Sequence, residues 1–111
     1  MESEKFDLII NESIEQIKHT LLVKSKEYRR NNNVYHNFDE GAKITGQTPE
    51  KVLYGFLLKH LISVADIRDD IDLGILPTLE KVEEKYNDIL VYTLIEKAMI
   101  IQRIKNQSND K

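Results

Sequence analysis

The sequence predicts an all-helical (all-α) fold, a compact bundle of three long helices and one short helix. Apolar residues recur every three or four positions over three long stretches, which is the spacing of one face of an α-helix. Two threonines, Thr48 and Thr78, stand where helix-capping residues are expected. At 111 residues with 41% hydrophobic content, the chain is long enough for one core and too short for two. We therefore predict a single domain over 1–111, with an ordered core over about 6–105 and a polar tail over 106–111.

The first long helix is predicted from Phe6 to about Arg30, because one stripe runs through this whole segment. The stripe comprises Phe6, Ile10, Ile14, Ile17 and Leu21, followed on the same face by Lys24 and Tyr28. Residues 29–34 (RRNNNV) contain three asparagines, which favour turns because their side chains bond to the nearby backbone. A polar loop is expected there.

A short helix is predicted next. Asn37 is followed three positions later by Glu40, a pattern that resembles the capping box of helix N-termini. Gly46 is a residue that commonly ends a helix, because glycine readily adopts the left-handed conformation found there. We therefore expect the short helix to begin at Asn37 and to end near Gly46.

Two further long helices follow, and each has a threonine before its first residue. Thr48 and Pro49 combine a capping hydroxyl with a proline at the first helical position, so a helix is expected from there to about Asp70. Apolar residues cover more than half of its circumference, which indicates a central position. Thr78 is expected to cap the last helix, which carries two apolar rows and should fray from Asn106 onward.

The composition limits the environment and the partners of the chain. Cysteine is absent, which excludes disulfides, thiolate zinc sites and cysteine nucleophiles and fits a reducing compartment. Polar residues interrupt the longest apolar stretch, 89–101, and the N-terminus lacks the order of a signal peptide. We expect a cytoplasmic protein with no membrane partner. A net charge of -3 offers no general attraction for a polyanion, so duplex nucleic acid is not an expected partner.

Three polar residues lie on predicted apolar stripes, where burial without a partner costs free energy. Lys24 has to reach solvent, a carboxylate or a bound anion with its ammonium group. His60 lies in line with Phe56 and Val64, so it is either a core histidine or a group that meets a ligand. If Asp88 is buried, its carboxylate needs a cation or several hydrogen-bond donors. These three side chains are candidates for a functional site.

Four acidic residues form a candidate metal site. If Glu27, Asp66, Glu84 and Asp88 converge inside the bundle, their oxygens would suit Mg²⁺, which itself binds nucleotide phosphates. The alternative is that these acids lie on solvated helix faces, as charged helical residues usually do. The sequence leaves both interpretations open.

The segment 35–38 (YHNF) follows a basic pair and combines two aromatic rings with an amide and an imidazole. Such a group could stack on a nucleobase and read its polar edge. The same residues would equally form a loop that buries its aromatic rings in the core. The chain contains no glycine-rich phosphate loop, nucleophile elbow, paired-histidine metal motif or zinc spacing, so familiar catalytic motifs are missing.

Five short blocks along the chain resemble one known family. They are 24–28 (KSKEY), 35–38 (YHNF), 46–50 (GQTPE), 58–63 (LKHLIS) and 88–92 (DILVY). In this order they resemble small phage and prophage proteins described as nucleotide-modification-associated or MazG-like, over about residues 20–100. The resemblance implies an all-helical fold, a location in the host-cell cytoplasm and a nucleotide-related role. It also implies a homo-oligomer with sites between helices of neighbouring subunits.

The resemblance gives individual residues a role in binding. The family's lysine and acid positions fall on Lys24, Glu27, Lys59, His60 and Asp88. For a nucleotide ligand, we expect the phosphate to meet the basic groups Lys24, Lys59 and His60. The base would then meet Tyr28 and Phe38, with Asn37 at a polar edge.

Catalysis is left open by one departure from the family pattern. MazG pyrophosphohydrolases hold magnesium with a Glu-x-x-Glu pair and a Glu-x-x-Asp pair on successive helices. In this chain Glu12 and Glu15 precede the matching blocks, and Glu84 and Asp88 are four positions apart.

Three hypotheses about function follow. The leading one is a protein that binds a nucleotide or nucleotide-derived ligand in a pocket between helices, with Mg²⁺-dependent pyrophosphohydrolysis if the acids hold the metal. A second is a non-catalytic protein that sequesters a nucleotide signal or regulates another protein. A third is a helical protein-protein interaction module with no small ligand.

Overall fold

The computed structural model describes residues 1–23, 30 and 33–109 of the chain. Within this part, four helices follow one another in the order α1 (Ser3–Leu22), α2 (His36–Thr45), α3 (Pro49–Asp72) and α4 (Leu79–Asn109). Three of these helices are long and one is short. The prediction of an all-helical fold is therefore confirmed.

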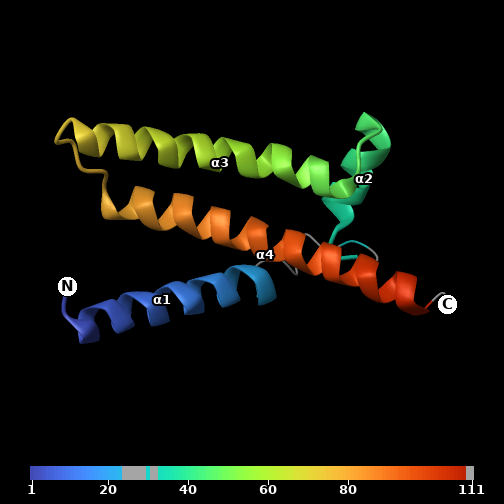
Figure 1. Ribbon diagram of the computed structural model, residues 1–111, viewed down its shortest axis with the longest axis horizontal. Coiled ribbons are helices and arrows are strands. Elements are labelled where there is room, and N and C mark those ends of the chain that lie inside the picture. The colour runs from blue at the N-terminus through green and yellow to red at the C-terminus, as the bar shows by residue number, and fades with distance from the viewer. Residues whose placement is uncertain (24–29, 31–32, 110–111) are drawn as a thin grey trace.

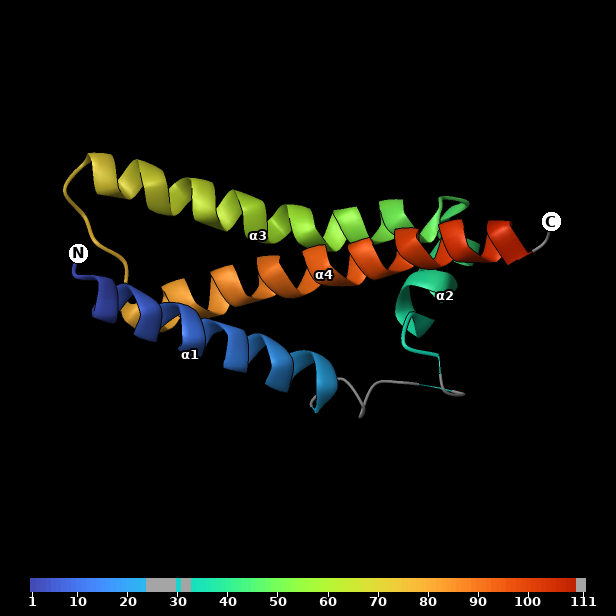
Figure 2. The same ribbon diagram turned by 60° about the horizontal axis from the view of Figure 1, so that its bottom comes forward.

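The three long helices form an open layer with α4 in the middle. Figures 1 and 2 show α4 between α3 and α1 from two directions. Among the described helices, α3 contacts α4 and α2, whereas α1 contacts α4 alone. The Cα radius of gyration is 16.9 Å, compared with about 13 Å for a compact chain of this length. The arrangement is thus more extended than the compact bundle that the sequence predicts.

The core is small and lies mainly between α3 and α4. Its buried apolar side chains are Phe38, Leu53, Leu57, Val64, Ile67, Val91 and Met99. Phe38 comes from α2 and the others from α3 and α4, while α1 contributes none. The expected central position applies to α4 rather than to α3, because α1 and α3 pack on opposite sides of α4 and do not meet in the described part.

The threonine caps of α3 and α4 are confirmed. The Thr48 hydroxyl oxygen accepts a hydrogen bond from the Lys51 backbone N–H at 3.3 Å, and Pro49 is the first residue of α3. Thr78 accepts in the same way from the N–H of Lys81 at 3.2 Å. Both contacts satisfy an N–H group that has no partner within the first helical turn. They involve residues three positions apart, which is why the sequence alone indicates them.

The predicted start of α2 is wrong. The helix begins at His36, with Tyr35 before it, and no side chain makes the cap hydrogen bond that was expected of Asn37. Asn33 orders the approach to the helix instead. Its amide oxygen accepts from the Tyr35 N–H at 2.9 Å, and its amide nitrogen donates to Asp39 Oδ2 at 2.9 Å. The side chain that orders the turn before α2 is therefore Asn33, which is not part of the helix.

Two glycines determine how α2 ends and how closely it packs. Gly46 follows the helix in the left-handed conformation, with φ 73°, and its N–H donates to the Ala42 carbonyl at 2.9 Å. The predicted end near Gly46 is thus confirmed. At Gly41, a Cβ atom would lie 2.8 Å from Val52 Cγ1, so the absence of a side chain lets α2 lie close to α3.

The other helix ends differ modestly from the predicted ones. α1 begins at Ser3 rather than Phe6, and its last residue is Leu22. The predicted final turns of that helix, over 24–29, lie outside the described residues, whereas Arg30, its predicted end, is not helical and forms an isolated bridge with Asn33. α4 continues to Asn109, past the expected fraying point at Asn106, so most of the predicted polar tail is helical.

Leu53→Ala is expected to lower the free energy of unfolding by about 2–5 kcal/mol, because Leu53 is fully buried and the change leaves a cavity. Urea denaturation followed by far-UV circular dichroism measures this change. Leu8→Ala on α1 is the matched control. Leu8 is 58% exposed, so the same substitution should change stability by about 0.5 kcal/mol or less. Equal losses in the two variants would contradict the assignment of the core to α3 and α4.

Candidate functional site

The predicted site residues differ in where they lie. Three of them, Lys24, Glu27 and Tyr28, fall outside the described residues. Four are exposed, namely Asn37, Lys59, Asp66 and Glu84. Three lie at least partly inside, namely Phe38, His60 and Asp88. The structure therefore brings only the last group into the packed part of the protein.

His60 on α3 and Asp88 on α4 face each other. Nδ1 of His60 lies 3.5 Å from Oδ2 of Asp88, with 21% and 34% of the two side chains exposed. Nδ1 is buried and has no hydrogen-bond partner in the described structure, so this contact is not a hydrogen bond, and it is an ion pair only when the imidazole is protonated. A protonated imidazole would supply the cation that a partly buried Asp88 needs.

Tyr92 is the centre of an aromatic cluster around this pair. Its ring lies 5.5 Å from the imidazole of His60 and 6.3 Å from the ring of Phe56, both in stacked orientation. Phe38 from α2 meets the Tyr92 ring edge-on at 6.4 Å. Phe38 is 8% exposed and belongs to the core, so its ring fills the core in the way that one of the two sequence interpretations described.

The sequence contained a signal for this cluster that our prediction did not use. Phe56 and His60 are four positions apart, as are Asp88 and Tyr92. Residues four apart lie on the same face of a helix, so packing α3 against α4 brings the two pairs together. From the sequence, Phe56 stood out only as an apolar residue in line with His60, and Tyr92 only as the last residue of the segment 88–92.

The environment of Tyr92 also changes its acidity. Burial raises the pKa of the Tyr92 hydroxyl above its usual value, and the negative charge of Asp88 raises it further. The phenol therefore stays protonated throughout the physiological pH range. Its hydroxyl is a neutral hydrogen-bond donor.

The predicted magnesium site is not assembled by the described residues alone. Among them, no group of three or more histidine, aspartate or glutamate side chains is close enough to hold a metal ion. Asp88 contacts His60, and a Glu84 oxygen lies 3.8 Å from Lys85 Nζ. Because Glu27 lies outside the described residues, magnesium binding stays a prediction.

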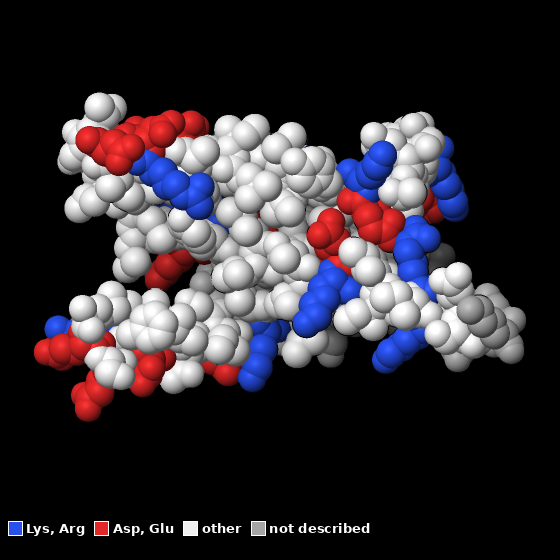
Figure 3. Space-filling view, in the orientation of Figure 1, with Lys and Arg blue, Asp and Glu red and all other residues white. Residues whose placement is uncertain are grey.

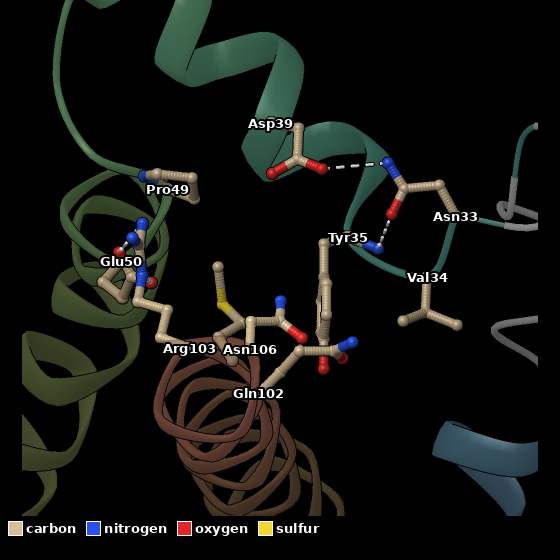
Figure 4. A pocket seen from close by; sticks show the side chains of 10 residues that line it. Asn33, Val34, Tyr35, Asp39, Pro49, Glu50, Gln102, Arg103 and Asn106 are labelled. Atoms are coloured by element: carbon tan, nitrogen blue, oxygen red, sulfur yellow. Dashed lines mark hydrogen bonds and ion pairs between the residues drawn. The ribbon is translucent and has the colours of Figure 1, made fainter. Parts of the chain in front are cut away.

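A polar hollow of about 450 Å³ lies where the starts of α2 and α3 face the last third of α4 (Figure 4). Its lining includes Asn33, Tyr35, Asp39, Gln102 and Asn106. None of these residues was singled out as a site residue from the sequence, apart from Tyr35 as part of the YHNF segment.

An ion pair between Glu50 and Arg103 borders this hollow (Figure 4). The guanidinium donates from Nε and Nη2 to the two carboxylate oxygens, with 3.0 Å between Nη2 and Oε2. These hydrogen bonds hold the pKa of Glu50 below its usual value and raise that of Arg103. The two residues are 53 positions apart, so local spacing gave no sign of the pair. It ties the start of α3 to the end of α4.

Comparisons with known proteins assign no family to this chain. No family model matches it, and neither a curated protein nor a solved structure matches it significantly. None of the described helices combines the length and the apolar character needed to span a membrane.

Glu50→Gln should reduce thermal stability at neutral pH and have little effect in acid. The lowered pKa of Glu50 means that its charged form stabilises the fold above the ordinary glutamate pKa of about 4.3, and that this contribution is lost as the pH falls through the lowered value. Melting temperatures of both proteins between pH 3 and pH 7 measure the difference. A gap that persists unchanged at pH 3 would mean that the ion pair is not its source.

Proposed function

We propose that this protein binds a nucleotide or nucleotide-derived ligand at the face where α3 meets α4, and that it does so without hydrolysing the ligand. One observation carries the proposal. His60 and Phe38, which the sequence predicts to meet phosphate and base, both pack against the Tyr92 ring, and Asp88, predicted to hold a metal, contacts His60. They come from three different helices, so their convergence is a property of the fold and not of any single motif.

An aromatic surface for a base is supplied by Phe56. Its side chain is 42% exposed, and its ring stacks on Tyr92 with 9° between the ring planes. Phe38 is covered and supports Phe56 from the side, with the ring centroids 5.9 Å apart. The base-stacking role therefore moves from Phe38 to Phe56, because only an exposed ring can meet a ligand.

Positive charge for a phosphate is supplied next to this ring. Lys59 is exposed and follows Phe56 by three positions, so the two side chains share one flank of α3. His60 adds a second cation when it is protonated, and the Asp88 carboxylate, 3.5 Å from its Nδ1, would stabilise that charge. A ligand that combines a flat ring with an anion, as a nucleotide does, matches this arrangement.

Binding without turnover is favoured by the position of the acids. Asp88 contacts His60 and Glu84 contacts Lys85, so each of these acids faces a basic side chain. We also propose, on the MazG-like resemblance, that the protein is of phage origin and acts in the cytoplasm of the host cell. Under this proposal the protein would sequester a nucleotide signal or regulate a partner. The enzymatic alternative, Mg²⁺-dependent pyrophosphohydrolysis, requires Glu27 or a second subunit to complete the metal site.

A second candidate function has its own observation. Large apolar side chains are exposed along all three long helices, including Ile10 at 40%, Leu61 at 38% and Leu90 at 42%. A helical interaction module with no small ligand would use such surfaces directly. In that case the aromatic cluster serves only to pack α3 against α4.

Nucleotides are expected to raise the melting temperature of the protein. At a ligand concentration 100-fold above Kd, the free energy of unfolding should rise by about 2.7 kcal/mol. The panel comprises nucleoside triphosphates, deoxynucleotides and cyclic dinucleotides, each with and without magnesium, and products are analysed in the same samples. Ligand recovered intact supports the proposal, whereas magnesium-dependent product that disappears in Asp88→Asn establishes the enzyme instead.

His60→Gln should raise the apparent Kd for the nucleotide about ten-fold, so that the nucleotide raises the melting temperature less. A ten-fold change is the scale of one lost charge-assisted hydrogen bond. His19→Gln on α1 is the matched control, since His19 is exposed and far from the cluster in sequence. Its shift should equal that of the unmodified protein. No shift with any nucleotide would exclude both nucleotide functions and leave the interaction module.

A further inference from the structure

α3 carries an apolar stripe on a flank that is turned away from its buried residues. The exposed fractions are 51% for Tyr54, 40% for Leu58, 38% for Leu61 and 54% for Ile62, and Ala65 is exposed as well. Tyr54, Leu58, Leu61 and Ala65 follow one another at spacings of four, three and four, which is the repeat of helices that pair along a seam. We call residues 54–65 on this flank the α3 stripe.

Charges of opposite sign stand at the two ends of the α3 stripe. Lys51 precedes it by three positions and Asp69 follows it by four, and both are exposed. The 18 positions between them make about five helical turns, so both side chains project on the same side as the stripe. Figure 3 shows uncharged side chains over the middle of α3 and a concentration of acidic side chains at its C-terminal end.

The charge imbalance extends along the whole helix. The first half of α3 contains two basic residues, Lys51 and Lys59, and one acidic residue, Glu50, so its net charge is +1. In the second half, Arg68 stands against the four aspartates Asp66, Asp69, Asp70 and Asp72, which gives -3. A second α3 of the same sequence is therefore complementary when it runs in the opposite direction.

The chain as a whole exposes more surface than a compact monomer of the same mass. The chain exposes 8764 Å², whereas a compact monomer of 13.0 kDa exposes about 6,300 Å². The excess is roughly 2,400 Å², and a standard protein interface takes only about 800 Å² from each partner. An open layer of helices with this much surplus surface has room for a partner on one face.

We infer that a second copy of this chain packs on the α3 stripe with its α3 antiparallel to the first. Lys51 of each copy then lies opposite Asp69 of the partner subunit, and in the same register Leu58 lies opposite Ile62 of the partner subunit. A parallel pair would place lysine against lysine and aspartate against aspartate at the two ends. The inference does not depend on nucleotide binding, because the stripe and the aromatic cluster use different residues.

The mass in solution and one apolar substitution test the surface. Light scattering after size-exclusion chromatography should give a dimer for the unmodified chain and a monomer for Leu61→Glu, with circular dichroism unchanged because Leu61 lies at the surface. Ile44→Glu on α2 makes the same change at a residue that is 85% exposed, and it should remain a dimer. A monomeric unmodified chain at all concentrations, or a dimer that Leu61→Glu does not disrupt, would overturn the inference.

A charge exchange tests the antiparallel direction. Lys51→Asp alone and Asp69→Lys alone should each weaken the dimer about ten-fold, since the two-fold symmetry converts two attractive pairs into repulsive ones. The double variant should return the dissociation constant to within about two-fold of the unmodified chain. In a parallel dimer, each of these positions faces the same position of the other copy, so like charges face each other in every variant. The double variant would then restore no affinity lost in a single variant.

Single cysteines provide an independent check, because the chain has none of its own. The positions for Gln47→Cys and Leu73→Cys each lie four residues beyond the charges that flank the stripe, Lys51 and Asp69. An antiparallel dimer should form disulfides only when the two variants are mixed. Disulfides within each variant alone would indicate a parallel dimer, whichever result the nucleotide panel gives.

Discussion

The packing of α3 against α4 is the contact on which the rest of the structure depends. Six of the buried apolar side chains come from these two helices, and the Glu50–Arg103 pair closes one end of the same interface. Fully burying each aliphatic side chain contributes about 1.5–3 kcal/mol, so this interface carries most of the hydrophobic stabilisation of the chain. α2 adds Phe38 to this core, and α1 packs on the other side of α4 without a buried residue of its own.

The same contact creates the candidate site. It sets the His60 imidazole from α3 against the Asp88 carboxylate from α4, and the Tyr92 ring stacks on the imidazole. It also leaves the outer flanks of the layer uncovered, because α4 has α3 on one side and α1 on the other. A ligand face and an association face can therefore coexist on α3, with Phe56 and His60 on one flank and the α3 stripe on another.

Local features of the fold were predictable from the sequence, and long-range ones were not. The caps at Thr48 and Thr78 and the glycine end of α2 depend on residues a few positions apart, so spacing revealed them. The start of α2 was misplaced because Asn33, three residues before the helix, orders the turn. The helix order across the layer depends on contacts between distant segments.

In the candidate site, too, the sequence indicated the individual residues but not the contacts between distant segments. His60 and Asp88 stood out because polar groups on apolar stripes need partners, although the sequence could not pair them with each other. Hydrogen exchange at two protein concentrations tests the central claim that one interface holds the fold. We expect the slowest amides in α3 and α4, fast exchange in α1, and added protection of residues 54–65 at the higher concentration. Equal protection of α1 and α3 at both concentrations would contradict the account.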